Sequence, residues 1–123
     1  MALGPVAQIH VSVTDIDRAV AFYRDVLELP LLFQVSGQPM AFFASGDVRL
    51  YLGVPEAAEF ASRCTLYFRV DDIHTEHRRL VSAGVPFQGD PRVVHRDATT
   101  ALWMAAFTDP DGHNLVLMQD RED

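Results

Sequence analysis

His10 is the residue of this sequence whose type and position best suit chemistry. It lies in the hexapeptide QIHVSV (residues 8–13), in which apolar and polar side chains alternate. An imidazole exchanges protons near neutral pH and can also bind a metal ion through a ring nitrogen. We interpret His10 as a polar residue lining a pocket, with acid–base catalysis as the second alternative and metal binding as the third.

The other histidines and the single cysteine offer less to a reaction. His74 and His77 lie three residues apart on a predicted helix, one residue short of the spacing at which two imidazoles share a metal. His95, in the charged sequence VVHRD, is a second candidate for acid–base chemistry. We expect His113 to occupy an exposed turn and Cys64 to be an unreactive thiol.

The composition limits the classes of function. A chain of 123 residues with 49% hydrophobic content can form one domain with its own core. Its 17 acidic and 10 basic side chains give a net charge of −7, which disfavours nucleic acid and anionic membranes and permits a neutral or cationic small molecule. One cysteine rules out an internal disulfide framework. The opening MALGPVAQ lacks a signal-peptide pattern, so we expect a cytoplasmic location.

Two segments of the chain share one design. Residues 8–16 (QIHVSVTDI) and 65–73 (TLYFRVDDI) each alternate apolar and polar side chains, as in a half-buried strand. An apolar stripe of helical spacing follows each of them, over residues 16–27 and 72–83. This repeat predicts two strand–helix units.

The ends of the two predicted helices carry capping residues. Thr14 or Asp15 can cap the first helix, and Pro30 follows its end. Gly84 has the position of a left-handed cap at the end of the second helix.

Further strands are predicted after each helix, with a weaker one around Phe87. The clearer strands cover residues 31–36, 41–45, 48–53, 101–108 and 114–119. A charged loop is predicted over residues 89–97 and a linker over residues 54–63. The sequence therefore predicts an α+β fold of two βαβββ modules, residues 7–53 and 64–119, in one domain of residues 1–123 whose curved mixed sheet encloses a cleft.

Three stretches of the sequence resemble the vicinal oxygen chelate superfamily: DIDRAVAFYRDVLELPLLF (15–33), YFRVDDIHTEHRRLVSAGVPF (67–87) and FTDPDGHNLVLMQ (107–119). This superfamily includes glyoxalase I, extradiol dioxygenases, methylmalonyl-CoA epimerase and the fosfomycin and bleomycin resistance proteins. The resemblance implies paired βαβββ modules around a cleft, usually in a homodimer. One scaffold hosts many chemistries, so the resemblance specifies the fold better than the reaction.

The resemblance also indicates where a metal would bind. Metal-dependent members hold a divalent ion with His or Glu side chains from four strands, and these positions correspond here to Gln8, Tyr51, Thr65 and Val116. An amide, a phenol and a hydroxyl are poor ligands for such an ion, and an isopropyl group is none. We therefore expect no metal and no other cofactor, which disfavours metal-dependent glyoxalase or dioxygenase activity.

Strand alternation identifies the side chains that would line the cleft. If Ile9, Val11 and Val13 pack against the first helix, their neighbours face the other way. The same alternation in the other strands completes the set of predicted ligand-binding residues: Gln8, His10, Ser12, Arg49, Tyr51, Thr65, Tyr67, Arg69, Trp103, Asn114, Val116 and Met118. Of the adjacent Trp103 and Met104, only one can face the cleft, and the alternation does not decide which.

The two arginines of this set have two possible roles. Arg49 or Arg69 could bind a carboxylate or phosphate group of a ligand, or pair with a nearby acidic residue.

Two functions fit these features. The first is a metal-free protein that binds a small molecule, similar to the bleomycin-resistance branch. The second is a metal-independent lyase or isomerase, with His10 as acid–base group and Tyr51 or Arg49 stabilising negative charge. We favour the first and leave catalysis open.

Overall fold

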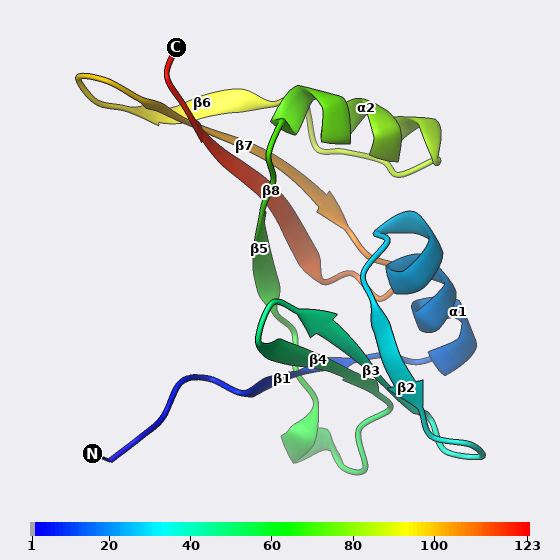
Figure 1. Cartoon of the computed structure of the whole chain (residues 1–123). Coiled ribbons are helices and arrows are strands. Elements are labelled where there is room, and N and C mark those ends of the chain that lie inside the picture. Colours follow the sequence, from blue (N-terminus) through cyan, green and yellow to red (C-terminus); the bar gives the residue numbers. More distant parts are fainter. Residues whose placement is uncertain (1) are drawn as a thin grey trace. The chain divides into compact units, whose positions relative to one another are not determined.

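The computed structural model describes residues 2–123, and the chain separates into two compact units, Met1–Arg63 and Cys64–Asp123 (Figure 1). Each unit contains a strand, a helix and three further strands in that order. This arrangement confirms the predicted α+β class and the two βαβββ modules. No helix within residues 2–123 is long and apolar enough to span a membrane.

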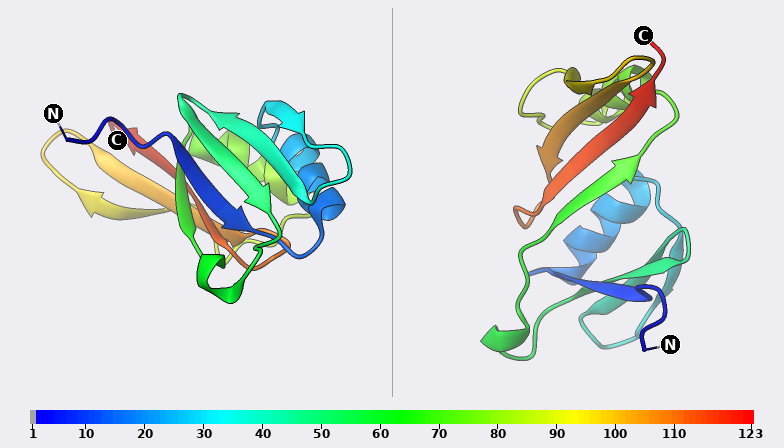
Figure 2. Two further views of the ribbon diagram at one scale, coloured as in Figure 1. Left: turned by 90° about the horizontal axis from the view of Figure 1, so that it is seen from below. Right: turned by 90° about the vertical axis from the view of Figure 1, so that its left-hand side faces the viewer.

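The N-terminal unit is a four-stranded mixed sheet with a helix across one face (Figure 2). Its strand order is β1-β4-β3-β2, with β1 parallel to β4 and the other pairs antiparallel. The elements are β1 (Gln8–Ser12), α1 (Ile16–Ala21), β2 (Leu31–Gln34), β3 (Met40–Ser45) and β4 (Val48–Gly53). Tyr23, Phe43 and Leu52 are among the fully buried side chains that form its core.

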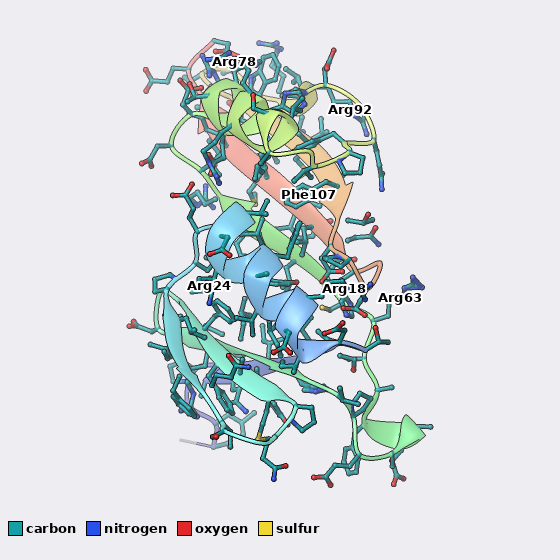
Figure 3. The ribbon with its side chains drawn as sticks, turned by 90° about the vertical axis from the view of Figure 1, so that its right-hand side faces the viewer. Arg18, Arg24, Arg63, Arg78, Arg92 and Phe107 are labelled. Carbon is teal, nitrogen blue, oxygen red and sulfur yellow. The ribbon has the colours of Figure 1, made fainter. Side chains whose placement is uncertain are left out.

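The C-terminal unit repeats this plan in the order β5-β8-β7-β6. Its elements are β5 (Thr65–Arg69), α2 (Ile73–Ser82), β6 (Arg92–Arg96), β7 (Ala101–Thr108) and β8 (Asn114–Arg121). Ile73 and Leu80 of α2 are buried, as is Phe107 of β7, which is labelled in Figure 3.

The strand register supports the predicted internal repeat. Gln8 lies beside Arg49 in the parallel pair of the N-terminal unit, and Thr65 lies beside Asn114 in the equivalent pair of the C-terminal unit. The sequence alignment that relates residue 8 to residue 65 is therefore also the structural alignment.

The predicted caps are present, although the first helix is irregular. The Asp15 side chain accepts a hydrogen bond from the backbone N–H of Arg18, so Asp15 rather than Thr14 is the cap. The α-helical part ends at Ala21 and continues as a π-helical turn over Phe22–Val26. Gly84 has a φ of 90°, as its left-handed role requires.

Two predicted elements after the second helix are wrong. Phe87 forms only an isolated bridge to Phe107, not a strand. The strand β6 instead occupies Arg92–Arg96, within the segment predicted to be a charged loop. β6 is an edge strand, and charged residues are common there because they discourage pairing with other chains.

The turn between β7 and β8 holds His113 in the interior, not in solvent as predicted. Asp109 and His113 are 5% and 3% exposed. One carboxylate oxygen of Asp109 accepts hydrogen bonds from the N–H groups of Asp111 and His113, both at 2.9 Å. Nδ1 of His113 accepts a hydrogen bond from the N–H of Cys64 at 3.1 Å. His113 therefore ties this turn to the residue that precedes β5.

Replacing His113 by alanine should destabilise the protein. His113→Ala removes a buried acceptor and leaves the N–H of Cys64 without this partner, at an expected cost of about 2–3 kcal/mol in the free energy of unfolding. Denaturant unfolding measures the change. His113→Asn keeps a side-chain acceptor and should lose less. An alanine variant with wild-type stability would contradict the structural role of His113.

Asp72, the cap of α2, should make stability depend on pH. Hydrogen bonds, first from the backbone N–H of Thr75 and also from that of His74, hold the pKa of the Asp72 carboxyl below its usual range. Its stabilising contribution is therefore present above the unfolded pKa of about 4 and is lost as pH falls through the lower folded pKa. Asp72→Asn keeps a capping oxygen but removes the negative charge at the start of α2, so it should lower Tm by roughly 1–3 °C at pH 7 and by less at pH 3.

Asp71→Asn is the matched control for this experiment. It removes the same charge from the adjacent residue, which does not cap the helix. Thermal unfolding of the three proteins at several pH values distinguishes the two effects. An equal pH dependence of Tm in the wild type and Asp72→Asn would contradict the prediction.

Candidate functional site

Four aromatic rings form a row on the face of the N-terminal sheet opposite α1, one ring from each strand. Phe33 of β2 stacks on Phe42 of β3 with ring centroids 4.6 Å apart. Phe42 stacks on Tyr51 of β4 at 4.9 Å and 17° between ring planes. The ring of His10 in β1 meets that of Tyr51 edge-on at 4.7 Å. We call Phe33, Phe42, Tyr51 and His10 the aromatic row.

The row follows from strand register and alternation. His10 pairs with Tyr51, and Tyr51 with Phe42, in neighbouring strands. The residues that follow them in sequence, such as Val11 and Leu52, are fully buried. Because successive side chains of a strand point to opposite faces, burial of one set exposes the other.

Gly53 leaves room for the Tyr51 ring. A Cβ atom at position 53 would lie only 2.6 Å from Cε1 of Tyr51, because the ring leans over the glycine. Any other residue at position 53 would therefore displace the ring from its place in the aromatic row.

A pocket of about 300 Å³ lies at the His10 end of the aromatic row. His10 and Tyr51 line it from the sheet, and Val54, Pro55, Glu56 and Phe60 line it from the segment after β4. This volume is at the lower end of the range for small-molecule sites. We call this cavity the hood pocket, and residues 54–62 the hood segment.

The hood segment is held at both ends and contains a short 3-10 helix, Ala58–Phe60. At its start, the N–H of Val54 donates to the carbonyl of Pro39 at 3.1 Å. At its end, the Ser62 hydroxyl donates to the carbonyl of His10 at 2.9 Å, and the Ser62 N–H donates to the Ser12 hydroxyl at 2.7 Å. The segment predicted to be a linker therefore forms a wall of the pocket.

These hydrogen bonds give Ser12 a structural role. Its hydroxyl lies 3.2 Å from that of Ser62, in addition to accepting the Ser62 N–H. Ser12 is not among the residues that line the hood pocket. Ser12 therefore helps to fix the hood segment, and its contact with a ligand stays a prediction.

Arg49 lies beside the aromatic row. Its guanidinium carbon is 5.6 Å from the centre of the Phe42 ring, which is the geometry of a cation–π contact. Gln8, its partner in the strand register, is exposed on the same face of the sheet.

The open face of the C-terminal sheet carries the other predicted residues. Thr65, Tyr67, Arg69 and Asn114 are exposed on its strands. Arg69 pairs with Asp120 at 3.2 Å, which is the second of the two roles considered for it. An exposed pair of this kind contributes little to stability.

A second pocket of about 300 Å³ lies on this face. Tyr67 and Val116 of the predicted set line it together with Met104. Arg92, labelled in Figure 3, lines it from the start of β6. Met118 lies beside Arg69 in the strand register and does not line this pocket.

Trp103 packs against α2, and its role as a ligand-binding residue stays a prediction. Its ring contacts that of His74 on α2 at 4.9 Å, and its Nε1 donates a hydrogen bond to the Asp123 carboxylate. Met104 takes the open face. Trp103 and Met104 thus lie on opposite faces, as strand alternation predicts, but only the tertiary packing shows which of the two residues faces the helix.

The structure also places the remaining candidate residues, His77, His95 and Cys64. His77 packs edge-on against Phe87 at 4.5 Å, and His95 is exposed on β6. Burial raises the pKa of the Cys64 thiol, with a smaller contribution from Asp109. A raised pKa keeps the thiol protonated at neutral pH, which makes it a poor nucleophile.

The residues at the family's metal positions do not fit a divalent ion. Tyr51 is part of the aromatic row and Val116 is a buried apolar side chain. Gln8 and Thr65 offer only an amide and a hydroxyl. Within residues 2–123, no three His, Cys, Asp or Glu side chains converge as a metal site would require.

Sequence reasoning missed Phe33, Phe42 and Phe60. Phe42 had a usable signal, because the two-residue turn between β3 and β4 pairs Ser45 with Val48 and therefore brings Phe42 beside Tyr51. The bulge between β2 and β3 shifts the strand pairing, so the sequence does not indicate which residue of β3 lies beside Phe33. No local pattern indicates that Phe60 returns to the sheet.

Comparison with other proteins agrees with this fold. The uncharacterized protein YraH of Bacillus subtilis (strain 168) is 29% identical over an alignment 122 positions long, and the match covers 89% of this chain and 92% of that protein. The structure of TnmS3, an antibiotic binding protein from Streptomyces sp. CB03234, is 27% identical with a TM-score of 0.78, covering 98% of this chain and 99% of that one.

A lactoylglutathione lyase from Agrobacterium tumefaciens is similar in fold, at 21% identity and a TM-score of 0.77 over 95% of this chain and 94% of that one. A sequence model of one family matches residues 5–117, nearly the whole chain. The chain therefore belongs to the Glyoxalase/Bleomycin resistance protein/Dioxygenase superfamily.

Proposed function

We propose that this protein binds a small organic molecule with a flat apolar part, in the hood pocket and against the aromatic row, without a metal ion. The hood pocket carries this proposal, because aromatic rings from the sheet and the hood segment enclose a cavity of about 300 Å³. Pockets with mostly apolar walls and a few polar groups are typical small-molecule sites.

Exposed aromatic side chains of the row and of the hood segment support the proposal. Phe33 is 48% exposed and Phe60 is 63% exposed. Large apolar side chains gathered on one face of a sheet mark an interaction site, because water solvates them poorly. The similarity to TnmS3, which is an antibiotic binding protein, also supports the binding of a small molecule.

The donor chemistry supports binding without a metal. The positions that hold metal in relatives carry an amide, a phenol, a hydroxyl and an isopropyl group in this chain. A Lewis-acid mechanism at those positions needs imidazole or carboxylate ligands.

A metal-independent lyase or isomerase is the second candidate. His10 and Glu56, two side chains that can exchange protons, line the same pocket. Tyr51 or Arg49 would then stabilise the negative charge that develops on the substrate. Continuous turnover of a bound compound, lost in His10→Ala, would distinguish this enzyme from a binding protein.

Several further features are part of the proposal. Gln8, Ser12, Thr65, Trp103, Asn114 and Met118 remain predicted ligand contacts, and a single domain over residues 1–123 remains part of the proposal. The family resemblance supports a homodimer, and the net charge of −7 supports a protein that binds neither nucleic acid nor anionic membranes. The cytoplasmic location stays a proposal.

A thermal-shift screen over glycopeptide antibiotics, aromatic acids and thioesters tests the proposed function. A ligand at one hundred times its Kd should add about 2.7 kcal/mol to stability and raise Tm. Replacing Tyr51 or Phe42 by alanine should weaken the best ligand about tenfold, because a stacking surface is lost. Val81→Ala, an exposed apolar change on α2, is the control. Unchanged affinity in both aromatic variants would contradict the proposed site.

Metal analysis gives a separate test. Protein prepared without a histidine tag should contain far less than one zinc, nickel, iron or manganese ion per chain, because the donors at the family positions do not fit. Treatment with a chelator should leave Tm and ligand affinity unchanged. A stoichiometric metal whose removal lowers affinity would contradict metal-free binding.

A further inference from the structure

We propose that the hood pocket selects an organic cation, and that Glu56 is the residue that determines this specificity. The inference rests on the proposed function and adds the chemical class of the ligand. A suitable ligand has a flat apolar body and a protonated amine, guanidinium or quaternary ammonium group.

The lining of the pocket carries the first step. Of the six residues that the structure places around it, Glu56 is the one carboxylate, and none is an arginine. The rest are His10, an aromatic pair, Tyr51 and Phe60, and two apolar residues. A carboxylate and the faces of aromatic rings both attract a cation, whereas they repel an anion.

The aromatic row already holds one cation of the chain itself. The guanidinium of Arg49 lies 5.6 Å from the centre of the Phe42 ring. Phe42 stacks on Tyr51, which is the next ring toward the hood pocket. The next ring, Tyr51, can therefore face a second cation in the hood pocket, where Glu56 supplies the opposite charge.

The hood segment brings Glu56 to the pocket in a defined position. Val54 is held through the carbonyl of Pro39, and Ser62 through the carbonyl of His10. Pro55, directly before Glu56, restricts the backbone further. A segment anchored on both sides of Glu56 loses less conformational freedom when a ligand binds.

A local effect of Glu56 has to be separated from the effect of the overall negative charge, and the hood segment contains a control for this. Glu59 lies in the same short helix as Phe60 but does not line the pocket. Glu56→Gln and Glu59→Gln change the net charge of −7 equally. A local interaction between Glu56 and the ligand is therefore lost only in Glu56→Gln.

Three probes of one shape test the inference: 2-naphthylmethylammonium, 2-naphthylmethanol and 2-naphthoate. Calorimetric titration of the wild type should give roughly fivefold tighter binding of the cation than of the alcohol, and the weakest binding for the anion. Glu56→Gln should remove the preference for the cation and leave the affinity for the alcohol within about twofold. Glu59→Gln should keep the wild-type order.

The possible outcomes separate this inference from the proposed function. An equal loss in both variants would assign the preference to the overall charge and overturn the role of Glu56. Tighter binding of the alcohol or the anion, weakened in Tyr51→Ala, would overturn the inference while the proposed function stands. Binding of none of the three probes would also overturn it, and the wider thermal-shift screen would then decide the proposed function by itself.

Discussion

The register of three hydrogen-bonded strands, β1, β4 and β3, is the constraint on which the candidate site depends. It places His10 beside Tyr51, and Tyr51 beside Phe42. A shift of one residue would turn these rings toward α1 and bring buried residues such as Val11 and Leu52 to the surface. Burial of the apolar set opposes that shift, so the interaction that stabilises the N-terminal unit also fixes the aromatic row.

A pocket forms beside the aromatic row only because the hood segment, which follows β4, returns to the sheet. The Ser62 hydroxyl and N–H bond to β1, fifty or more positions earlier in the sequence. Gly53 contributes on the sheet side, since its missing side chain lets the Tyr51 ring lean over it. Two small residues thus shape a pocket that is lined mainly by larger side chains, among them aromatic rings and a carboxylate.

Local patterns predicted those parts of the fold that local physics determines. Alternation fixed the open face of β1 and therefore the place of His10, and Asp72 marked the start of α2. β6 escaped prediction because an edge strand can be charged and resembles a loop. Alternation left Trp103 and Met104 undecided, because it gives two faces without saying which one meets the helix. The hood segment and the buried His113 depend on contacts with residues far away in sequence, which no local pattern reveals.

The two modules separate the contribution of the fold from that of the side chains. Tyr51 and Val116 occupy equivalent positions in the strand register, and so do Phe42 and Ala106. Identical backbone pairing thus supports stacked rings in one unit and small apolar groups in the other. Because the scaffold is common to both, the binding that we propose for the hood pocket follows from side chains of the N-terminal unit and its hood segment, and membership of the superfamily does not determine it.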